Sequence, residues 1–201
     1  MAKRQTKIER PYKDRRYRKL FVLAVEGRKT EQEYFAIFTQ KGSVVKVECL
    51  PSGSNCSPGK VLRRMAARLR KEALKPSDEA WLVVDRDEWQ DEQLSPLHAW
   101  TKQKANYSLA VSNPKFEYWL VLHFEDGRGV VTARDCDARL RQYLPDYDKG
   151  IDGKKITPER IDQAIRRARL RDDPPCEDWP RKTGSTVYKL AASILAAQTR
   201  D

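Results

Sequence analysis

The sequence has few of the residues that build zinc sites, disulfide frameworks or membrane spans. It contains two histidines, His98 and His123, and four cysteines, none of which forms a C-x-x-C pair. This argues against the common zinc sites, and we interpret the cysteines as reduced thiols. No apolar run approaches the ~18 residues of a membrane-spanning helix. A phosphate-binding loop of the G-x-x-x-x-G-K-[ST] type is also lacking, which lowers the case for nucleotide hydrolysis.

Basic residues are in clear excess. The 201 residues include 40 Lys and Arg against 29 Asp and Glu, a formal net charge of +11. Residues 1–19 hold nine of the basic residues and only two acidic ones, Glu9 and Asp14. We interpret residues 1–19 as a flexible basic arm, which either keeps the protein in solution or grips phosphates. A polyanion, with nucleic acid as the first candidate, is the partner that this charge suits.

No apolar stretch of a secretory signal follows the basic N-terminal residues. We therefore expect a cytoplasmic protein with no membrane association.

Short apolar runs alternate with amphipathic segments along the first 128 residues. Continuous apolar runs are typical of strands buried on both faces of a parallel sheet, and such runs predict strands at Leu20–Val25 and Ala80–Val84. The alternation over Val44–Leu50 predicts a further strand, and Tyr107–Val111 is expected to be the fourth. Helical spacing of apolar residues predicts intervening helices over about 31–40, 60–75 and 92–104, and one that carries Phe116 to Phe124.

Two helix starts are predicted from capping patterns. Thr30 and Glu33 have the spacing of a capping box. Asn113 is expected to cap the helix after the fourth strand, with Pro114 as its first residue.

Beyond Gly129 we predict only helices, over 133–143, 158–171 and 185–198. The sequence therefore predicts an α/β protein with a mostly parallel four-stranded sheet and flanking helices in residues 20–128. Residues 129–201 are expected to form a helical C-terminal part packed on that core.

Acidic residues follow three of the predicted strands. Glu26 ends the first strand, Asp85 and Asp87 end the third, and Glu117 lies one turn into the helix after the fourth. Ligands of open parallel sheets bind outside the carboxyl ends of the strands, so these side chains should meet there. Carboxylate oxygens suit Mg²⁺ or Mn²⁺, and like charges brought together favour a cation. Each acid alone could equally cap a helix or pair with a neighbour such as Arg28 or Arg86.

Three ordered motifs resemble those of the RloB-like proteins. They are Val25-Glu26-Gly27-Arg28-Lys29-Thr30-Glu31 with Tyr34-Phe35, then Val84-Asp85-Arg86-Asp87, then Ser112 to Leu120 through His123-Phe124. The run Thr183 to Leu190 is similar to the C-terminal block of that family. The resemblance implies a bacterial protein of restriction-modification and phage-defence loci, with a Toprim-like fold.

The Toprim resemblance also implies site residues. Asp85 and Asp87 would bind Mg²⁺ or Mn²⁺, and Glu26 would be a further ligand or the general acid/base of phosphodiester chemistry. Glu31 or Glu117 could contribute to a second metal ion. No tyrosine is placed by a motif for covalent catalysis, and the additional domains of topoisomerases and primases are missing, so a nuclease is the better inference.

Other residues could support such a site. Arg28, Lys29 and Lys115 lie at the same predicted edge and could neutralise phosphates. Further basic candidates and two supporting residues are Arg64, Arg68 and Lys182, and Asn113 and His123. Each also has a structural interpretation: the basic residues as solvated surface charges, Asn113 as a helix cap and His123 as a core imidazole.

Two functions follow. The first is a metal-dependent nuclease that acts on RNA or DNA in bacterial anti-phage defence. The alternative is a non-catalytic module of a defence complex that binds nucleic acid or a ribonucleoprotein, while phosphotransfer on the same acidic edge is a weaker third reading. A partner protein is implied by analogy only, and the oligomeric state stays open.

Overall fold

The computed structural model describes residues 17–39, 43–53, 56–87, 89–148 and 150–199. Residues 1–16, most of the predicted basic arm, lie outside the described residues. Within the described residues, no helix is both long and apolar enough to cross a lipid bilayer.

The sheet has five strands in the order β2-β1-β3-β4-β5. Their bounds are β1 Lys19–Val25, β2 Val45–Leu50, β3 Glu79–Asp85, β4 Tyr107–Asn113 and β5 Gly184–Ser185. The first four are parallel, which confirms the predicted α/β class and the four predicted strands. β5 was not predicted: it pairs antiparallel with the end of β4 over two residues, too few to give a hydrophobic pattern.

Seven α-helices connect and cover the strands in the described residues. They are α1 Thr30–Ala36, α2 Pro58–Lys71, α3 Asp91–Thr101, α4 Phe116–Val121, α5 Ala133–Tyr143, α6 Pro158–Arg171 and α7 Val187–Thr199. A short 3₁₀ turn, Gly153–Lys155, precedes α6.

Two predicted helix starts are wrong. α1 is capped at Lys29, with no capping hydrogen bond from its side chain, and Glu33 instead accepts a hydrogen bond from the Ile151 N–H at 2.7 Å. Before α4, Asn113 is the last residue of β4 and Lys115 is the cap. The strand hydrogen bonds carry the chain two residues further than the apolar run suggests, so the helix starts later.

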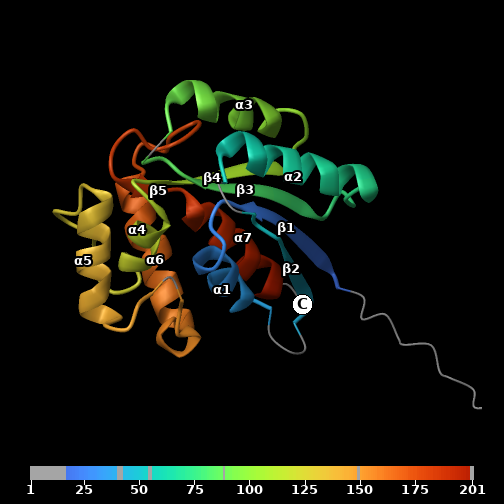
Figure 1. The fold of residues 1–201 in the computed structure, drawn as a ribbon. Coiled ribbons are helices and arrows are strands. Elements are labelled where there is room, and N and C mark those ends of the chain that lie inside the picture. Colours follow the sequence, from blue (N-terminus) through green and yellow to red (C-terminus); the bar gives the residue numbers. More distant parts are fainter. Residues whose placement is uncertain (1–16, 40–42, 54–55, 88, 149, 200–201) are drawn as a thin grey trace, which may run out of the picture.

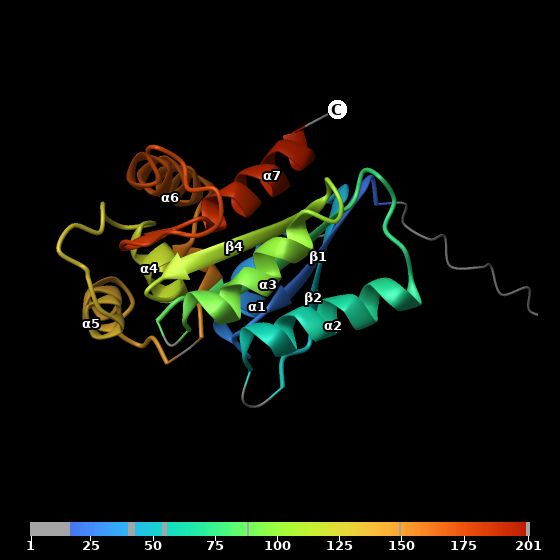
Figure 2. The same cartoon turned by 90° about the horizontal axis from the view of Figure 1, so that it is seen from above.

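Helices cover both faces of the sheet, as Figures 1 and 2 show. α2 and α3 pack on one face, where Val22, Ala24 and Leu82 belong to an apolar cluster with Val61 of α2. Phe21, Leu23 and Val25 point to the other face and pack with α1 and α7. Because successive strand residues point to opposite sides, a strand buried on both faces must be apolar throughout.

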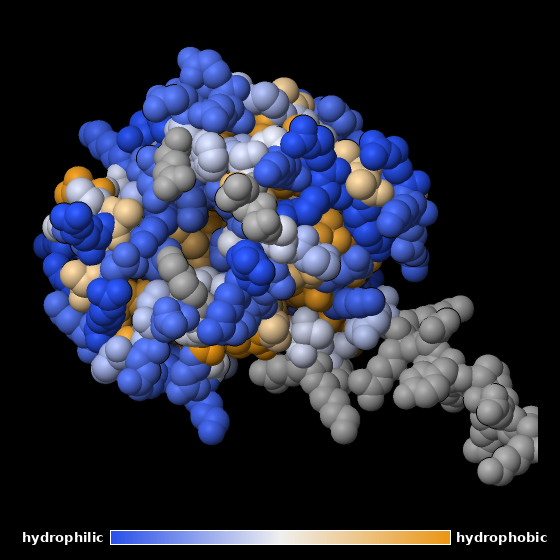
Figure 3. Space-filling view, in the orientation of Figure 1, coloured by the Kyte–Doolittle hydropathy of each residue, from blue (hydrophilic) through white to orange (hydrophobic). Residues whose placement is uncertain are grey.

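The C-terminal helices share the larger of these two clusters. It includes Phe21 of β1, Trp119 of α4, Leu140 of α5 and Ile194 of α7, all fully buried. In Figure 2 the arrowhead of β4 points to the side where α4 and α5 lie. The surface in Figure 3 is mostly hydrophilic, with apolar side chains in small separate areas. The C-terminal part therefore packs on the sheet and adds elements near the carboxyl ends of its strands.

Candidate functional site

Glu26 and Asp85 meet where β1 and β3 end. The two strands pair in parallel with Val25 opposite Val83, and the Glu26 N–H continues the ladder to the Val83 carbonyl at 3.0 Å. The Glu26 side chain then turns to β3, where its Oε2 accepts a hydrogen bond from the Asp85 N–H at 3.1 Å. Its Oε1 accepts a second bond from Trp89 Nε1 at 2.9 Å. The predicted meeting of these two carboxylates at one sheet edge is therefore present.

The turn that carries Asp85 and Asp87 is anchored to the neighbouring strand. The Arg86 N–H donates to the Ser112 carbonyl at 2.9 Å, and the Asp87 N–H donates to the Pro114 carbonyl at 2.9 Å. Asp85 is half-buried, while Asp87 is exposed. The chain after β3 is thus held against the end of β4, which fixes where both aspartates emerge.

Glu31 and Glu117 reach the same place from two helices. Glu31 is buried at the start of α1, and its Oε1 accepts a hydrogen bond from the Gly27 N–H at 2.7 Å. Glu117 is buried in α4, and its Oε1 accepts a hydrogen bond from the Tyr147 hydroxyl at 2.8 Å. Lys115 Nζ lies 3.9 Å from the other oxygen of Glu117.

Burial and the charges of their neighbours raise the pKa of two of these carboxylates. Burial raises the pKa of Glu26 to about 7, and the charges of Glu31 and Asp87 add to the increase. Burial also raises the pKa of Asp85 well above its usual range, with further contributions from Glu31, Glu26, Glu117 and Asp87 in that order. We call Glu26, Glu31, Asp85, Asp87 and Glu117 the acidic cluster.

The acidic cluster suits a hard divalent cation by its chemistry. All of its donors are carboxylate oxygens, which Mg²⁺ and Mn²⁺ prefer, and a cation would offset their mutual repulsion. As the side chains lie, no group of three or more His, Cys, Asp or Glu side chains within the described ranges is arranged to hold a metal ion. Both oxygens of Glu26 accept hydrogen bonds from N–H donors, so its carboxyl group would have to turn to bind a metal ion.

Three predicted phosphate contacts lie around this edge. Arg28 and Lys29 are exposed, and Lys29 Nζ reaches the Asp148 carbonyl at 3.5 Å. Lys115 is buried, and its Nζ pairs with Asp137 at 2.7 Å. This ion pair holds the positive charge of Lys115 in place near Glu117.

The remaining predicted basic residues differ in their surroundings. Arg64 donates from Nη2 to the Val25 carbonyl, at the carboxyl end of β1. Arg68, one turn further along α2, pairs with Glu48 at 2.8 Å and with Glu72 at 2.9 Å. Lys182 is exposed in the segment before β5. The structure thus brings Arg64 to the site, whereas Arg68 is engaged by two carboxylates elsewhere.

The two predicted supporting residues have structural contacts. Asn113 Nδ2 donates to the Pro180 carbonyl at 3.0 Å and holds the chain before β5. His123 is fully buried, with Nδ1 2.9 Å from the Trp119 carbonyl and Nε2 3.2 Å from the Tyr34 hydroxyl. Burial lowers the pKa of His123 to about 4, so the ring is neutral near pH 7 and holds α4 against α1.

Sequence reasoning missed Trp89 and Tyr147. Trp89 lies two residues after Asp87, and this short separation was the available signal that its indole could reach the cluster. Tyr147 follows α5, and its hydroxyl lies between Glu117 and Thr30 Oγ1, the latter at 3.2 Å. No local pattern in the sequence indicates that long-range contact.

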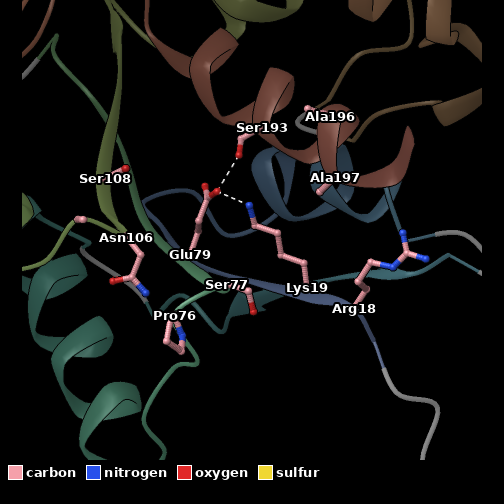
Figure 4. Close-up of a pocket in the computed structure, with 11 residues that line it drawn as sticks. Arg18, Lys19, Pro76, Ser77, Glu79, Asn106, Ser108, Ser193, Ala196 and Ala197 are labelled. Atoms are coloured by element: carbon pink, nitrogen blue, oxygen red, sulfur yellow. Dashed lines mark hydrogen bonds and ion pairs between the residues drawn. The ribbon is translucent and has the colours of Figure 1, made fainter. Parts of the chain in front are cut away.

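At the opposite end of the sheet, the carboxylate of Glu79 is paired with a lysine and with neutral hydrogen-bond donors (Figure 4). Glu79, the first residue of β3, accepts hydrogen bonds from Lys19 Nζ at 2.5 Å, Ser193 Oγ at 2.8 Å and Trp81 Nε1 at 2.7 Å. It lines a pocket of about 640 Å³ in which the charged side chains drawn are Glu79, Lys19 and Arg18. The acidic cluster thus lies at the carboxyl ends of β1 and β3, whereas the pocket at the other end of β3 contains one carboxylate and two cations.

Comparison with known families identifies the family of the chain. A model of the RloB-like protein family matches residues 21–194, from β1 into α7. The chain belongs to the RloB-like family. The matched part of this RloB-like protein contains the whole acidic cluster and Tyr147. No curated protein and no solved structure was found to match the chain.

Proposed function

We propose that this RloB-like protein is a nuclease that depends on Mg²⁺ or Mn²⁺ and hydrolyses phosphodiester bonds in RNA or DNA. The observation that carries the proposal is the meeting of Glu26 and Asp85 where β1 and β3 end, a place where burial and the charges of neighbouring carboxylates raise the pKa of both groups. A cluster whose ionised form is disfavoured by burial and like charge is a typical active-site arrangement, and a divalent cation stabilises the ionised form.

The residues divide into roles by their surroundings. Asp85 and Asp87 emerge from one anchored turn and would hold the metal ion, with Glu31 as a further ligand. A metal ion bound there would polarise the phosphoryl oxygen and lower the pKa of an attacking water. Glu26, with a pKa of about 7, can take up or release a proton near neutral pH, and the Trp89 and Asp85 N–H groups fix its carboxyl group.

A cleavage assay tests the proposal. Purified wild-type protein, Asp85→Asn and Glu26→Gln are offered single- and double-stranded DNA, tRNA and unstructured RNA, with Mg²⁺, Mn²⁺ or EDTA. Glu92→Gln, which removes an exposed carboxylate in the first turn of α3, is the charge-matched control. We expect metal-dependent cleavage by the wild type and the control, and at least a hundredfold loss in both cluster variants.

Metal binding is measured alongside by calorimetry with Mn²⁺ alone. Retained cleavage by folded Asp85→Asn refutes the proposed site. Tight nucleic-acid binding with no turnover and no Mn²⁺ binding supports instead the non-catalytic module, for which the net charge of +11 is the observation in favour.

The biological setting of the proposal is anti-phage defence in the bacterial cytoplasm, together with a partner protein of the same system. It rests on the resemblance of the three motifs to the family. Phage plating on cells that express the wild type or Asp85→Asn tests it: we expect fewer plaques with the wild type only. Equal plating on both strains contradicts a defence role for the acidic cluster.

A further inference from the structure

A basic groove lies next to the acidic cluster. Gly53 and Cys56, which follow β2, and residues 60–67 of α2 border an open hollow of about 340 Å³. Its lining residues are Gly53, Cys56, Lys60, Arg63, Arg64 and Ala67. Three of these six residues are basic and none is acidic. Most of the wall of the hollow is apolar, so the charged ends of the three basic side chains are what complements a negatively charged ligand.

Two contacts join this groove to the end of β1. Arg64 donates from Nη2 to the Val25 carbonyl, and Ser52 Oγ donates to the Glu26 carbonyl at 2.8 Å. Val25 is the last residue of β1, and Glu26 is the member of the acidic cluster that follows it. Figure 2 shows that α2 starts at the end of the sheet towards which the arrowhead of β4 points. The hollow therefore adjoins the end of β1, from which Glu26 reaches the acidic cluster.

The basic residues of α2 fall into two groups by their pairing. Within the described ranges, neither Arg63 nor Arg64 forms an ion pair with an Asp or Glu side chain, whereas Arg68 pairs with both Glu48 and Glu72. Arg64 Nε is also buried without a hydrogen-bond partner in that part of the chain. Arg63 and Arg64 thus carry positive charge that no acidic residue within the described ranges neutralises.

The position of this charge along the helix strengthens the argument. The first turn of α2 contains no acidic residue, and Lys60 and Arg63 are exposed within its first six residues. Cations near a helix N-terminus oppose the helix dipole, which favours anions there. A bound phosphate would offset this unfavourable arrangement.

We propose that the groove of Lys60, Arg63 and Arg64 binds the phosphate backbone of a polynucleotide whose adjoining phosphate lies at the acidic cluster. The inference rests on the proposed nuclease function and specifies its substrate as a polymer with several phosphates in a row. The groove contacts carry no base recognition, since cations contact phosphates alike in every sequence.

Binding is measured by fluorescence anisotropy in EDTA, with the Asp85→Asn protein as the background, so that no cleavage occurs. Labelled single-stranded DNA and RNA of one length are the probes, and duplexes of the same sequences are further arms. The groove variant is the double substitution Lys60→Ala/Arg63→Ala. The control is Arg70→Ala/Lys71→Ala, which removes two exposed charges from the last turn of the same helix.

We expect the groove variant to bind single strands roughly tenfold more weakly, with a slope of log affinity against log salt that is smaller by about 1.4. The control charges lie about 10 Å further along the helix, beyond the Debye length of about 8 Å, so the control should bind like the background protein. Equal weakening in both variants, unchanged binding by the groove variant, or no binding by the background protein overturns the groove.

The two proposals can fail separately. A wild type that binds but cleaves no substrate refutes the nuclease and leaves the groove result standing. A wild type that cleaves, together with a groove variant that binds unchanged, refutes the groove alone.

Discussion

The Tyr147 hydroxyl donates a hydrogen bond of 2.8 Å to Glu117 Oε1, which joins the segment after α5 to the acidic cluster. The same hydroxyl lies 3.2 Å from Thr30 Oγ1 at the start of α1. Three segments that are far apart in the sequence therefore meet at one phenol oxygen. The C-terminal helical part does more than cover the sheet, because it helps to position a carboxylate of the candidate site.

We expect Tyr147→Phe to lower the free energy of unfolding by about 1–3 kcal/mol, because it leaves the buried Glu117 without this donor. Tyr143→Phe is the matched control. Tyr143 donates to Glu125 at 2.8 Å near the surface, and Glu125 keeps its pair with Arg139, so the control should cost less than about 1 kcal/mol. Urea unfolding of both variants gives the comparison. Equal losses of unfolding free energy would show that the buried hydrogen bond to Glu117 stabilises the protein no more than the one to Glu125 does.

Gly27→Ala is expected to disturb the cluster without unfolding the protein. A Cβ atom at Gly27 would lie 1.9 Å from Glu31 Oε2, so the Glu31 carboxylate must move away. We expect Mn²⁺ affinity to fall at least tenfold, because a residue that orients a metal ligand typically contributes that much. Calorimetry with Mn²⁺ measures this effect. Gly59→Ala has no neighbouring atom within 4 Å and should keep the wild-type affinity; a similar loss there would contradict the steric explanation.

The sequence was informative wherever a local pattern determines the outcome. Runs such as Leu20–Val25 are apolar at every position because helices cover both faces of β1, so the strand could be recognised. Parallel pairing then brings Glu26 and Asp85 to the same edge, which is why two distant acids could be predicted to meet. Arg64 lies at this edge for a related reason, since α2 packs beside β1.

What the sequence did not reveal depends on contacts between distant segments. β5 consists of Gly184 and Ser185, and it is a strand only because the end of β4 offers free hydrogen-bonding groups. Tyr147 lies in an irregular segment, so no period marks it. Arg68 lies one helical turn after Arg64, so the sequence places both on the same face of α2, but of the two only Arg68 pairs with Glu48 of β2. Pairing across the fold, and not residue type, decides which charges stay available.

Asp85→Asn is expected to stabilise the metal-free protein while it abolishes the proposed activity. Burial and four neighbouring carboxylates disfavour the charged form of Asp85, so the amide removes a repulsive group. In EDTA at pH 8 we expect a gain of about 1–2 kcal/mol in the free energy of unfolding. Addition of Mg²⁺ should shrink the difference, since the ion stabilises the wild type only.

Asp78→Asn provides the opposite case, at the other end of β3. Asp78 precedes β3 and accepts hydrogen bonds from the Leu20 N–H at 2.9 Å and the Lys75 N–H at 3.0 Å. Its loss of charge should cost about 1–3 kcal/mol. Thermal and urea unfolding of both variants measure the contrast. If Asp85→Asn destabilises as Asp78→Asn does, Asp85 is a structural residue and the repulsion argument is wrong.

His123 should make stability fall in acid. Its pKa is lowered by burial to about 4 in the folded protein, against an ordinary value of 6.5. The stabilisation is therefore fully present above pH 6.5 and is lost as the pH falls from 6.5 towards 4, by up to about 3 kcal/mol. Glu26 changes in the opposite sense between pH 4.5 and 7, because its pKa is raised to about 7. Only a difference between variants separates the two groups.

The measurement is urea unfolding of the wild type and His123→Phe from pH 4.5 to 7.5, with Glu26 present in both. His123→Phe keeps an aromatic ring but loses the contacts to Trp119 and Tyr34, so it should be less stable than the wild type at pH 7.5. As the pH falls the deficit should shrink, by at most about 1.4 kcal/mol per pH unit, since one proton is involved. A constant deficit across this range would mean that the folded His123 binds its proton as readily as the unfolded chain does, and the buried neutral imidazole would be ruled out.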